Sequence, residues 1–337
     1  MGEVTVPLAV VDGPGQHHMT GIRARVAAAP ISWGISEVSG WGHQMSRQRV
    51  LTEIRELGLT ATEFGPDGFL PDDPSARSQL LREYGISGIG GFVPVVLHDA
   101  AVDPVPMVMR VAEEFAGAGA SLLVLAAEYG REGYDGRAAL EDAQWRQLLE
   151  NLDRACAAAD DRGVKAVLHP HMGTPVERPD DVERVLDGSG IPLCLDTGHY
   201  FVGGGSPASL AGAAAHRIAH VHLKDAEPGL AGKVRQGDVG YAEGVRTGMY
   251  VRLGAGAAEI AATVGALESA GYQGWYVIEQ DQRLESEPPQ RAGPVADVRA
   301  SLDFLGQLGS AQRDRDLDAG GLGTPAPSGQ DTLGGRP

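Results

Sequence analysis

Short apolar runs alternate with segments of helical periodicity along most of the chain. Eight of these runs have the length and the aliphatic composition of buried strands. Strands that alternate with helices favour a parallel sheet, and eight such units are typical of a (β/α)8 TIM barrel. The pattern therefore predicts an α/β fold of the TIM-barrel class. The predicted strands occupy residues 25–33, 60–64, 88–96, 121–127, 164–169, 192–196, 218–222 and 275–279.

The segments between the runs have the spacing of amphipathic helices. In segment 47–58, Val50, Leu51 and Ile54 fall on one face, and Gly58 follows as a natural helix end. Segments 145–163 and 257–271 repeat this spacing, and each also closes on glycine. We expect these helices to cover the outside of the barrel.

A doubly wound open sheet is the alternative architecture for such a pattern. That fold usually carries a GxGxxG turn after its first strand, and the sequence GISEVSGWG stands there instead. The barrel is therefore favoured, as one catalytic domain over residues 24–308. Residues 1–23 are expected to be a leader. Residues 309–337 are expected to be a disordered tail, because their Gly, Pro and polar residues show no periodicity.

One connection is too long for an ordinary loop of a barrel. Segment 226–256, before the last strand, is expected to be a lid or a substrate-binding element, and a floppy surface insertion is the alternative. It carries four basic side chains that could bind a phosphate, face solvent or lie at a subunit contact. They are Lys233, Arg235, Arg246 and Arg252.

Four consecutive strands end in side chains that bind metals. They are His169, Asp196, His222 and Glu279. In a parallel barrel the carboxyl ends of the strands face one bowl, so these side chains are expected to converge on one divalent cation. A mixed imidazole and carboxylate shell suits Mn²⁺, Co²⁺, Fe²⁺ or Zn²⁺ better than Ca²⁺, which prefers oxygen ligands alone.

Further reactive side chains flank these four. His171 shares a face with His169 in extended backbone, and His199 follows Asp196 across a strand-to-loop turn. Lys224 continues the face of His222, where a neighbouring dication would lower the pKa of its ammonium and suit it to acid or base chemistry.

Two other groups have competing interpretations. Glu63 ends the second strand and could face the bowl or pair with an arginine, whereas His220 is expected to point into the barrel or pack on a helix. Asp281 shares a face with Glu279 in the last motif.

Composition narrows the class of partner. Asp and Glu number 45 against 28 Lys and Arg, which gives a net charge of −17. Such a charge repels nucleic-acid phosphates and anionic lipid, so neither nucleic acid nor membrane is expected as a partner. Two cysteines, an apolar content of 42% and the absence of a bilayer-spanning apolar run predict a cytoplasmic protein that acts on a small molecule, and a homo-oligomer is possible.

Several motifs of the chain resemble those of a known family. They are HPHMGT, LDTGHYFVGG, HVHLKD, GMYVRLGAG and GYQGWYVIEQDQ, with APISW and TATEFGPDGFLP nearer the N-terminus. They are similar to the inosose dehydratase branch of the xylose-isomerase-like TIM barrels, and the resemblance covers residues 25–305. It implies a divalent metal on His169, Asp196, His222 and Glu279, with Mn²⁺ or Co²⁺ first and Zn²⁺, Fe²⁺ or Mg²⁺ as alternatives. No nucleotide cofactor is expected.

The resemblance also implies the reaction, in which 2-keto-myo-inositol loses water to give a trihydroxycyclohexane-dione. Lys224 or His199 would take a proton from carbon, and a protonated His171 or His199 would give one to the departing hydroxyl. Glu63, Trp33 and Asp281 are expected to bind the substrate.

Two departures bear on this interpretation. Isomerases and epimerases similar to this fold carry Glu at the position of His169, so their symmetric pair of carboxylate bases is absent here. Ala255 stands where similar dehydratases often carry Glu, which leaves the substrate open. A keto-sugar isomerase or epimerase and a non-catalytic, metal-stabilised binding barrel remain as alternatives.

Overall fold

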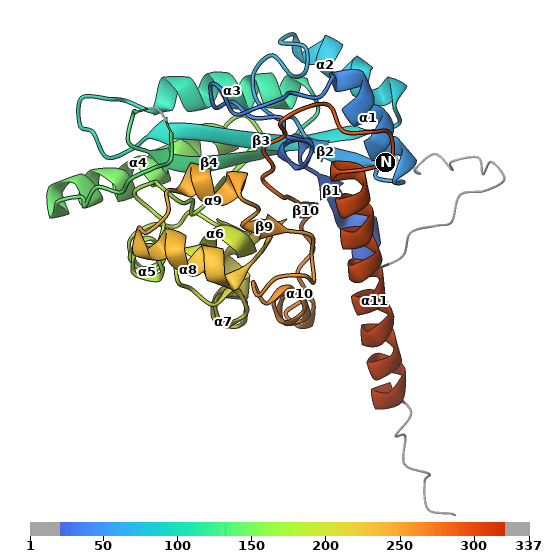
Figure 1. Ribbon diagram of the computed structural model, residues 1–337. Coiled ribbons are helices and arrows are strands. Elements are labelled where there is room, and N and C mark those ends of the chain that lie inside the picture. Colours follow the sequence, from blue (N-terminus) through green and yellow to red (C-terminus); the bar gives the residue numbers. More distant parts are fainter. Residues whose placement is uncertain (1–20, 132, 321–337) are drawn as a thin grey trace, which may run out of the picture.

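The protein is a closed barrel of eight parallel strands surrounded by helices (Figure 1). The computed structural model describes residues 21–131 and 133–320. The strands lie in the order β1-β10-β7-β6-β5-β4-β3-β2, and β1 pairs with both β10 and β2 to close the ring. The TIM-barrel prediction is thus confirmed. The barrel strands are β1 (Val26–Ala28), β2 (Ala61–Glu63), β3 (Ser87–Val96), β4 (Leu122–Glu128), β5 (Lys165–Leu168), β6 (Leu193–Asp196), β7 (Ile218–Leu223) and β10 (Tyr276–Ile278).

Each of the eight predicted apolar runs contains one barrel strand, or most of it. The first run contains β1 and then the short helix η2 (Pro30–Trp33), which ends at Gly34 with a left-handed φ of 75°. Along the strands, alternate side chains face opposite sides. Leu123 and Leu125 of β4 join the main core under the helices, whereas Leu122 and Val124 join a separate cluster.

Helices follow the strands and cover the ring. Helix α1 shows how the sequence fixes one of them. Ser46 accepts a hydrogen bond from the Arg49 N–H and so caps the first turn, and Val50, Leu51 and Ile54 are buried. The outer helices are α1 (Arg47–Glu56), α2 (Pro74–Glu83), α3 (Val105–Gly117), α4 (Asp142–Asp160), α5 (Pro179–Gly188), α6 (Thr197–Val202), α7 (Pro207–Ala214), α10 (Ile260–Ser269) and α11 (Pro294–Gly320), with 3-10 turns η1 (Gly21–Arg25) and η3 (Ala215–Arg217).

The long segment before the last strand is folded. It forms α8 (Pro228–Gln236) and α9 (Tyr241–Arg246), and a small antiparallel sheet joins β8 (Asp225–Ala226) to β9 (Tyr250–Val251). Its apolar side chains, among them Val234, Val245 and Met249, pack in a cluster of their own with Trp41. The interpretation of this segment as a floppy insertion is therefore wrong.

The C-terminal helix is long. Helix α11 continues through Gly320 and extends past the body of the barrel (Figure 1), so the first part of segment 309–337, expected to be disordered, is helical. The rest of that segment, and residues 1–20 of the expected leader, lie outside the described residues. Among the described residues, no helix has the length and apolarity to cross a membrane.

Candidate active site

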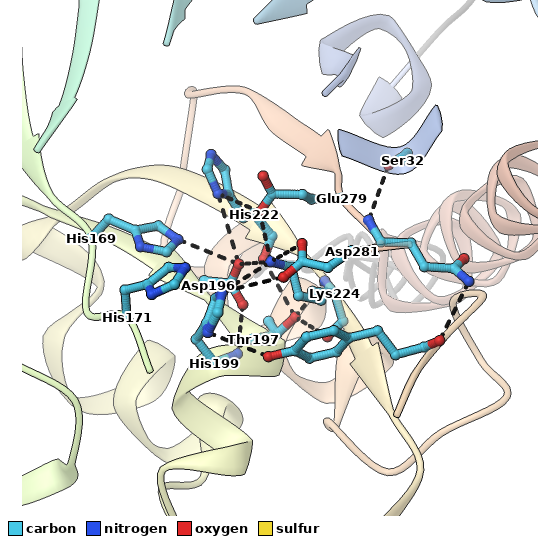
Figure 2. A network of polar contacts seen from close by, with 12 residues as sticks. Ser32, His169, His171, Asp196, Thr197, His199, His222, Lys224, Glu279 and Asp281 are labelled. Atoms are coloured by element: carbon cyan, nitrogen blue, oxygen red, sulfur yellow. Dashed lines mark hydrogen bonds and ion pairs between the residues drawn. The ribbon is translucent and has the colours of Figure 1, made fainter. Parts of the chain in front are cut away.

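The structure brings the four predicted metal-binding side chains to one point at the carboxyl end of the barrel (Figure 2). They come from the ends of β5, β6, β7 and β10. The His169 Nε2 lies 3.4 Å from Asp196 Oδ2, and the His222 Nδ1 lies 2.9 Å from Glu279 Oε2 and 3.8 Å from Asp196 Oδ2. One donor atom from each of the four falls within 4.8 Å of the others.

The chemistry of these donors fits a divalent cation. His169, Asp196 and His222 are about 1% exposed, so their polar atoms have little access to solvent. Nevertheless, the His222 Nδ1 makes no hydrogen bond, although a carboxylate oxygen is 2.9 Å away. Buried polar atoms are normally paired, and an imidazole lone pair that faces carboxylates is suited to a shared cation.

Asp196 has two structural tasks. Its Oδ1 accepts a hydrogen bond from the His199 N–H at 2.7 Å and so caps helix α6. Its Oδ2 faces His169, His222 and Glu279, which together with Asp196 are called the cation set below. The motif DTGH, which begins at Asp196, thus starts helix α6 directly at the end of β6. Thr197 joins this turn to β7, because its hydroxyl accepts a hydrogen bond from the Lys224 N–H at 2.9 Å.

Lys224 lies at the centre of a group of buried carboxylates. Its Nζ is 2.7 Å from Asp281 Oδ1, 3.0 Å from Glu279 Oε2 and 3.3 Å from Asp196 Oδ2. Burial alone would lower the pKa of Lys224, but these carboxylates raise it well above its ordinary value. These carboxylates therefore favour the ammonium form, and the lowering that the sequence predicts depends on a bound dication and stays a prediction.

His199 is the base nearest to this ammonium. Its Nε2 lies 3.0 Å from the Lys224 Nζ. An ammonium only donates hydrogen bonds, so this Nε2 must be the acceptor. The Met172 N–H donates to the other ring nitrogen, Nδ1, at 3.3 Å, and the Tyr250 hydroxyl lies 3.3 Å from the same Nδ1.

His171 and His199 are both neutral in this environment. Their ring centroids are 3.8 Å apart. Burial, together with the charge of His169 and Lys224, lowers the pKa of His171 to about 3. Burial, with His171 and Lys224, also lowers the pKa of His199 well below its usual value. These pKa shifts disfavour a protonated histidine as the acid, whereas the carboxylates keep a proton on Lys224.

Two tyrosines of the folded insertion complete this side of the site. The Tyr241 hydroxyl, on α9, donates to Asp281 Oδ2 at 2.7 Å, and Tyr250, on β9, lies beside His199. The Lys224 Nζ also lies 5.0 Å from the centre of the Tyr250 ring. Nothing in the linear pattern marks these two tyrosines except that they are aromatic side chains in a long connection.

A cavity of about 490 Å³ opens above these groups. Its lining includes His171, His199, Lys224, Glu63 and Asp281, as well as Trp41 and Tyr134, which sequence reasoning missed.

Trp33 does not line the cavity. Its side chain is fully buried in the main core, and its indole N–H donates to Glu53 Oε2 at 2.8 Å. This corrects the expectation that Trp33 binds substrate. Trp33 lies in the 3-10 helix η2 and not in an extended strand, so the alternation of a strand does not direct it to the bowl, and the later Trp41 lines the cavity instead.

The departure at Ala255 and the basic side chains of the insertion lie elsewhere. Ala255 is exposed, and Arg246 pairs with Glu243 on the surface. None of Lys233, Arg235, Arg246 and Arg252 is among the residues that line the cavity.

Comparison with known proteins relates the chain to one family of barrels. The model of the family "Xylose isomerase-like TIM barrel" matches residues 51–308. An inosose dehydratase of Geobacillus kaustophilus is 30% identical over 297 residues, which is 84% of this chain and 94% of that protein. The rhizopine catabolism protein MocC of Rhizobium meliloti is 28% identical and covers 85% of this chain and 89% of its own length.

Solved structures agree on the fold. An L-ribulose 3-epimerase superposes with a TM-score of 0.66 at 16% identity, over 89% of this chain and 99% of the other. An IOLI protein with a bound zinc atom superposes with a TM-score of 0.61 at 14% identity, over 85% of this chain and 98% of the other. At these identities the likeness establishes the barrel architecture.

Proposed function

Because the chain belongs to the xylose isomerase-like TIM barrel family, in the branch that contains the inosose dehydratases, we propose that it is a metal-dependent hydro-lyase of a cyclic keto-polyol. The substrate we propose is inosose (2-keto-myo-inositol), and the product is the corresponding dione. The observation that carries the proposal is one base and one acid, His199 and Lys224, in contact beside a cation set of two imidazoles and two carboxylates.

His169, Asp196, His222 and Glu279 would hold the cation. A bound divalent ion there supplies a Lewis acid, which polarises the ketone of the substrate and makes the neighbouring C–H more acidic. Mn²⁺ or Co²⁺ suits the donor set, and Zn²⁺, which the IOLI structure holds, suits it as well.

The proton transfers follow from the positions of the two side chains. His199 Nε2 accepts the proton from the carbon next to the ketone, and the C–O bond of the neighbouring carbon breaks. Lys224 Nζ gives a proton to the departing hydroxyl, which leaves as water. The 3.0 Å contact between the two nitrogens then lets the proton on His199 return to Lys224, so the site is reset without another donor.

An elimination needs one base and one acid, whereas inversion at carbon needs a base on each face of the substrate. His171 donates through Nδ1 to the Met172 carbonyl oxygen at 2.7 Å, which leaves Nε2 as an acceptor for a substrate hydroxyl. Asp281 is held by Lys224 and Tyr241. The arrangement therefore supports dehydration over epimerisation.

The charges around the cavity support an uncharged substrate. Its lining carries six carboxylates and three cationic side chains. Lys224 is paired with buried carboxylates, Arg110 is paired with Glu114, and Arg77 donates to two backbone carbonyl oxygens. A phosphate group would meet no free cation there. The carboxylates are Glu37, Glu63, Asp67, Glu114, Glu279 and Asp281.

The test uses chelator-stripped protein reloaded with Mn²⁺ or Co²⁺ and supplied with inosose. We expect metal-dependent consumption of inosose, abolished in Asp196→Ala and unchanged in Asp187→Ala, where the exposed carboxylate lies on α5. Consumption that does not depend on metal, or that survives in Asp196→Ala, would refute the proposed site. Activity in the cytoplasm and the absence of nucleic-acid or membrane partners stay predictions.

A further inference from the structure

Glu63 makes a contact across the barrel that the mechanism above does not use. It ends β2, whereas His220 and His222 lie on β7, and strands β1 and β10 stand between them in the ring. Its Oε1 nevertheless lies 2.8 Å from His220 Nε2 and 2.9 Å from His222 Nε2. The intervening strand β1 consists of Val26 and two alanines, and such small side chains leave room for the carboxylate to cross.

This contact determines where each imidazole carries its proton. A carboxylate oxygen only accepts hydrogen bonds, so both Nε2 atoms must donate to it. All three side chains are at most 4% exposed, so water does not compete for Glu63. His220 donates its Nε2–H to the same oxygen and so keeps Glu63 directed at β7. The Nδ1 of His220 has no hydrogen-bond partner.

The tautomer of His222 has a direct consequence for the cation set. With the proton on Nε2, the lone pair of Nδ1 faces Glu279 Oε2 at 2.9 Å and Asp196 Oδ2 at 3.8 Å. With the proton on Nδ1, that nitrogen would have no lone pair to offer to a metal.

We propose that Glu63 is a positioning residue that holds His222 in the tautomer able to bind a metal, with His220 as the second anchor of the carboxylate. This role goes beyond the substrate contact expected for Glu63 from the sequence, and it rests on the cation set of the proposed function. Carboxylates that accept from a ligating histidine typically change metal affinity 10–100-fold when they are removed.

The experiment measures metal affinity, with Co²⁺ titrated into chelator-stripped protein against a competing chelator and followed by its visible absorption. Glu63→Ala is expected to weaken the Kd for Co²⁺ by about 10–100-fold. Glu63→Gln, whose amide oxygen can still accept from both rings, is expected to recover most of the affinity. The proposal would be overturned if Glu63→Ala had the same Co²⁺ absorption spectrum as the natural protein and a Kd for Co²⁺ within threefold of the natural value.

Glu53→Ala is the matched control. Glu53 is also a buried carboxylate, bound to Trp33 and Arg49, but it lies outside the cation set. Its loss is expected to lower stability and leave the Kd for Co²⁺ unchanged. An equal loss of affinity in Glu53→Ala would show that any buried carboxylate has this effect, and would overturn a specific role of Glu63.

A second measurement separates this inference from the proposed function. Nitrogen-15 NMR of histidine-labelled, Zn²⁺-loaded protein reports the state of the His222 Nε2–H. The expected result is an Nε2–H protected from exchange with water in the natural protein and unprotected in Glu63→Ala, whether or not the protein turns over inosose. An equally protected Nε2–H in both proteins would contradict the role of Glu63, whereas failure of the natural protein to bind Co²⁺ would contradict the cation set itself.

Discussion

Replacement of Lys224 by methionine tests the electrostatics of the site most severely. The side chain is 1% exposed, and its ammonium lies within 3.3 Å of three carboxylates. Methionine keeps much of the volume of the lysine stem and removes the charge. The carboxylates of Asp196, Glu279 and Asp281 would then remain buried without their cation. Removal of one partner from a buried ionic group costs about 3–5 kcal/mol, and we expect this loss of unfolding free energy in the metal-free variant.

The same substitution should strengthen metal binding. The Lys224 ammonium contacts Asp196 Oδ2 and Glu279 Oε2, which are the oxygens of the cation set. Two unit charges about 4 Å apart interact by ~4 kcal/mol at an effective dielectric constant of ~20, and a dication doubles this repulsion. Even if most of that energy is lost to relaxation, Lys224→Met should bind Mn²⁺ or Co²⁺ at least about tenfold more tightly. Turnover should nevertheless be abolished, because the proton donor is gone.

Three measurements decide this prediction. Urea unfolding with and without metal gives the stabilities, titration against a competing chelator gives the Kd for metal, and consumption of inosose gives turnover. Lys165→Met is the control, since Lys165 is exposed at the start of β5. The reasoning is refuted if Lys224→Met binds metal more weakly than the natural protein, or if its metal-free form loses less than about 1 kcal/mol of stability.

Two further substitutions probe the surroundings of Lys224. Tyr241→Phe removes the hydrogen bond to Asp281, so we expect a loss of about 1 kcal/mol of unfolding free energy and a lower kcat, with little change in metal affinity. Urea unfolding and steady-state kinetics measure these effects. An unchanged kcat would count against the insertion as part of the site. Gly198→Ala would place a methyl group 2.5 Å from the Lys224 Cγ, so turnover should fall strongly. Gly212→Ala in α7 is the control, because the added methyl group would meet no neighbouring group within 4 Å. This variant should keep its turnover and gain a little thermal stability. Equal activity of the two alanine variants would contradict the close packing of α6 on Lys224.

The fold and the cation set were predictable because both depend on regular features. The period of the strands and helices repeats along the chain, and the ends of consecutive strands necessarily meet at one end of a barrel. His169, Asp196, His222 and Glu279 each follow or end an apolar run, so their convergence follows from the architecture. Sequence alone also indicated His199 and Lys224, because they lie close to these strand ends.

Contacts that depend on the closure of the ring were beyond the sequence. Glu63 meets His220 and His222 only because the closed barrel leaves just two strands, β1 and β10, between β2 and β7. The three carboxylates around Lys224, which determine its charge, are equally invisible in a linear pattern. Tyr241 reaches Asp281 from a short helix inside a connection, where no periodicity marks an element.

The choice between Trp33 and Trp41 shows a more local limit. Both tryptophans follow β1, and the chain makes a left-handed turn at Gly34 between them; Trp33 is buried in the core and Trp41 lines the cavity. Glycine permits such a turn without requiring it, so the sequence leaves the direction of the chain open.

The most direct test of the central claim is the mass of the product formed from inosose by metal-loaded protein in deuterated water. Dehydration by His199 and Lys224 predicts a product that has lost one molecule of water, is formed only when the metal is present, and carries on carbon the one deuterium that the enol takes up when it becomes the dione. A product that retains every oxygen of the substrate and carries one deuterium on carbon would contradict dehydration and identify an isomerase or epimerase.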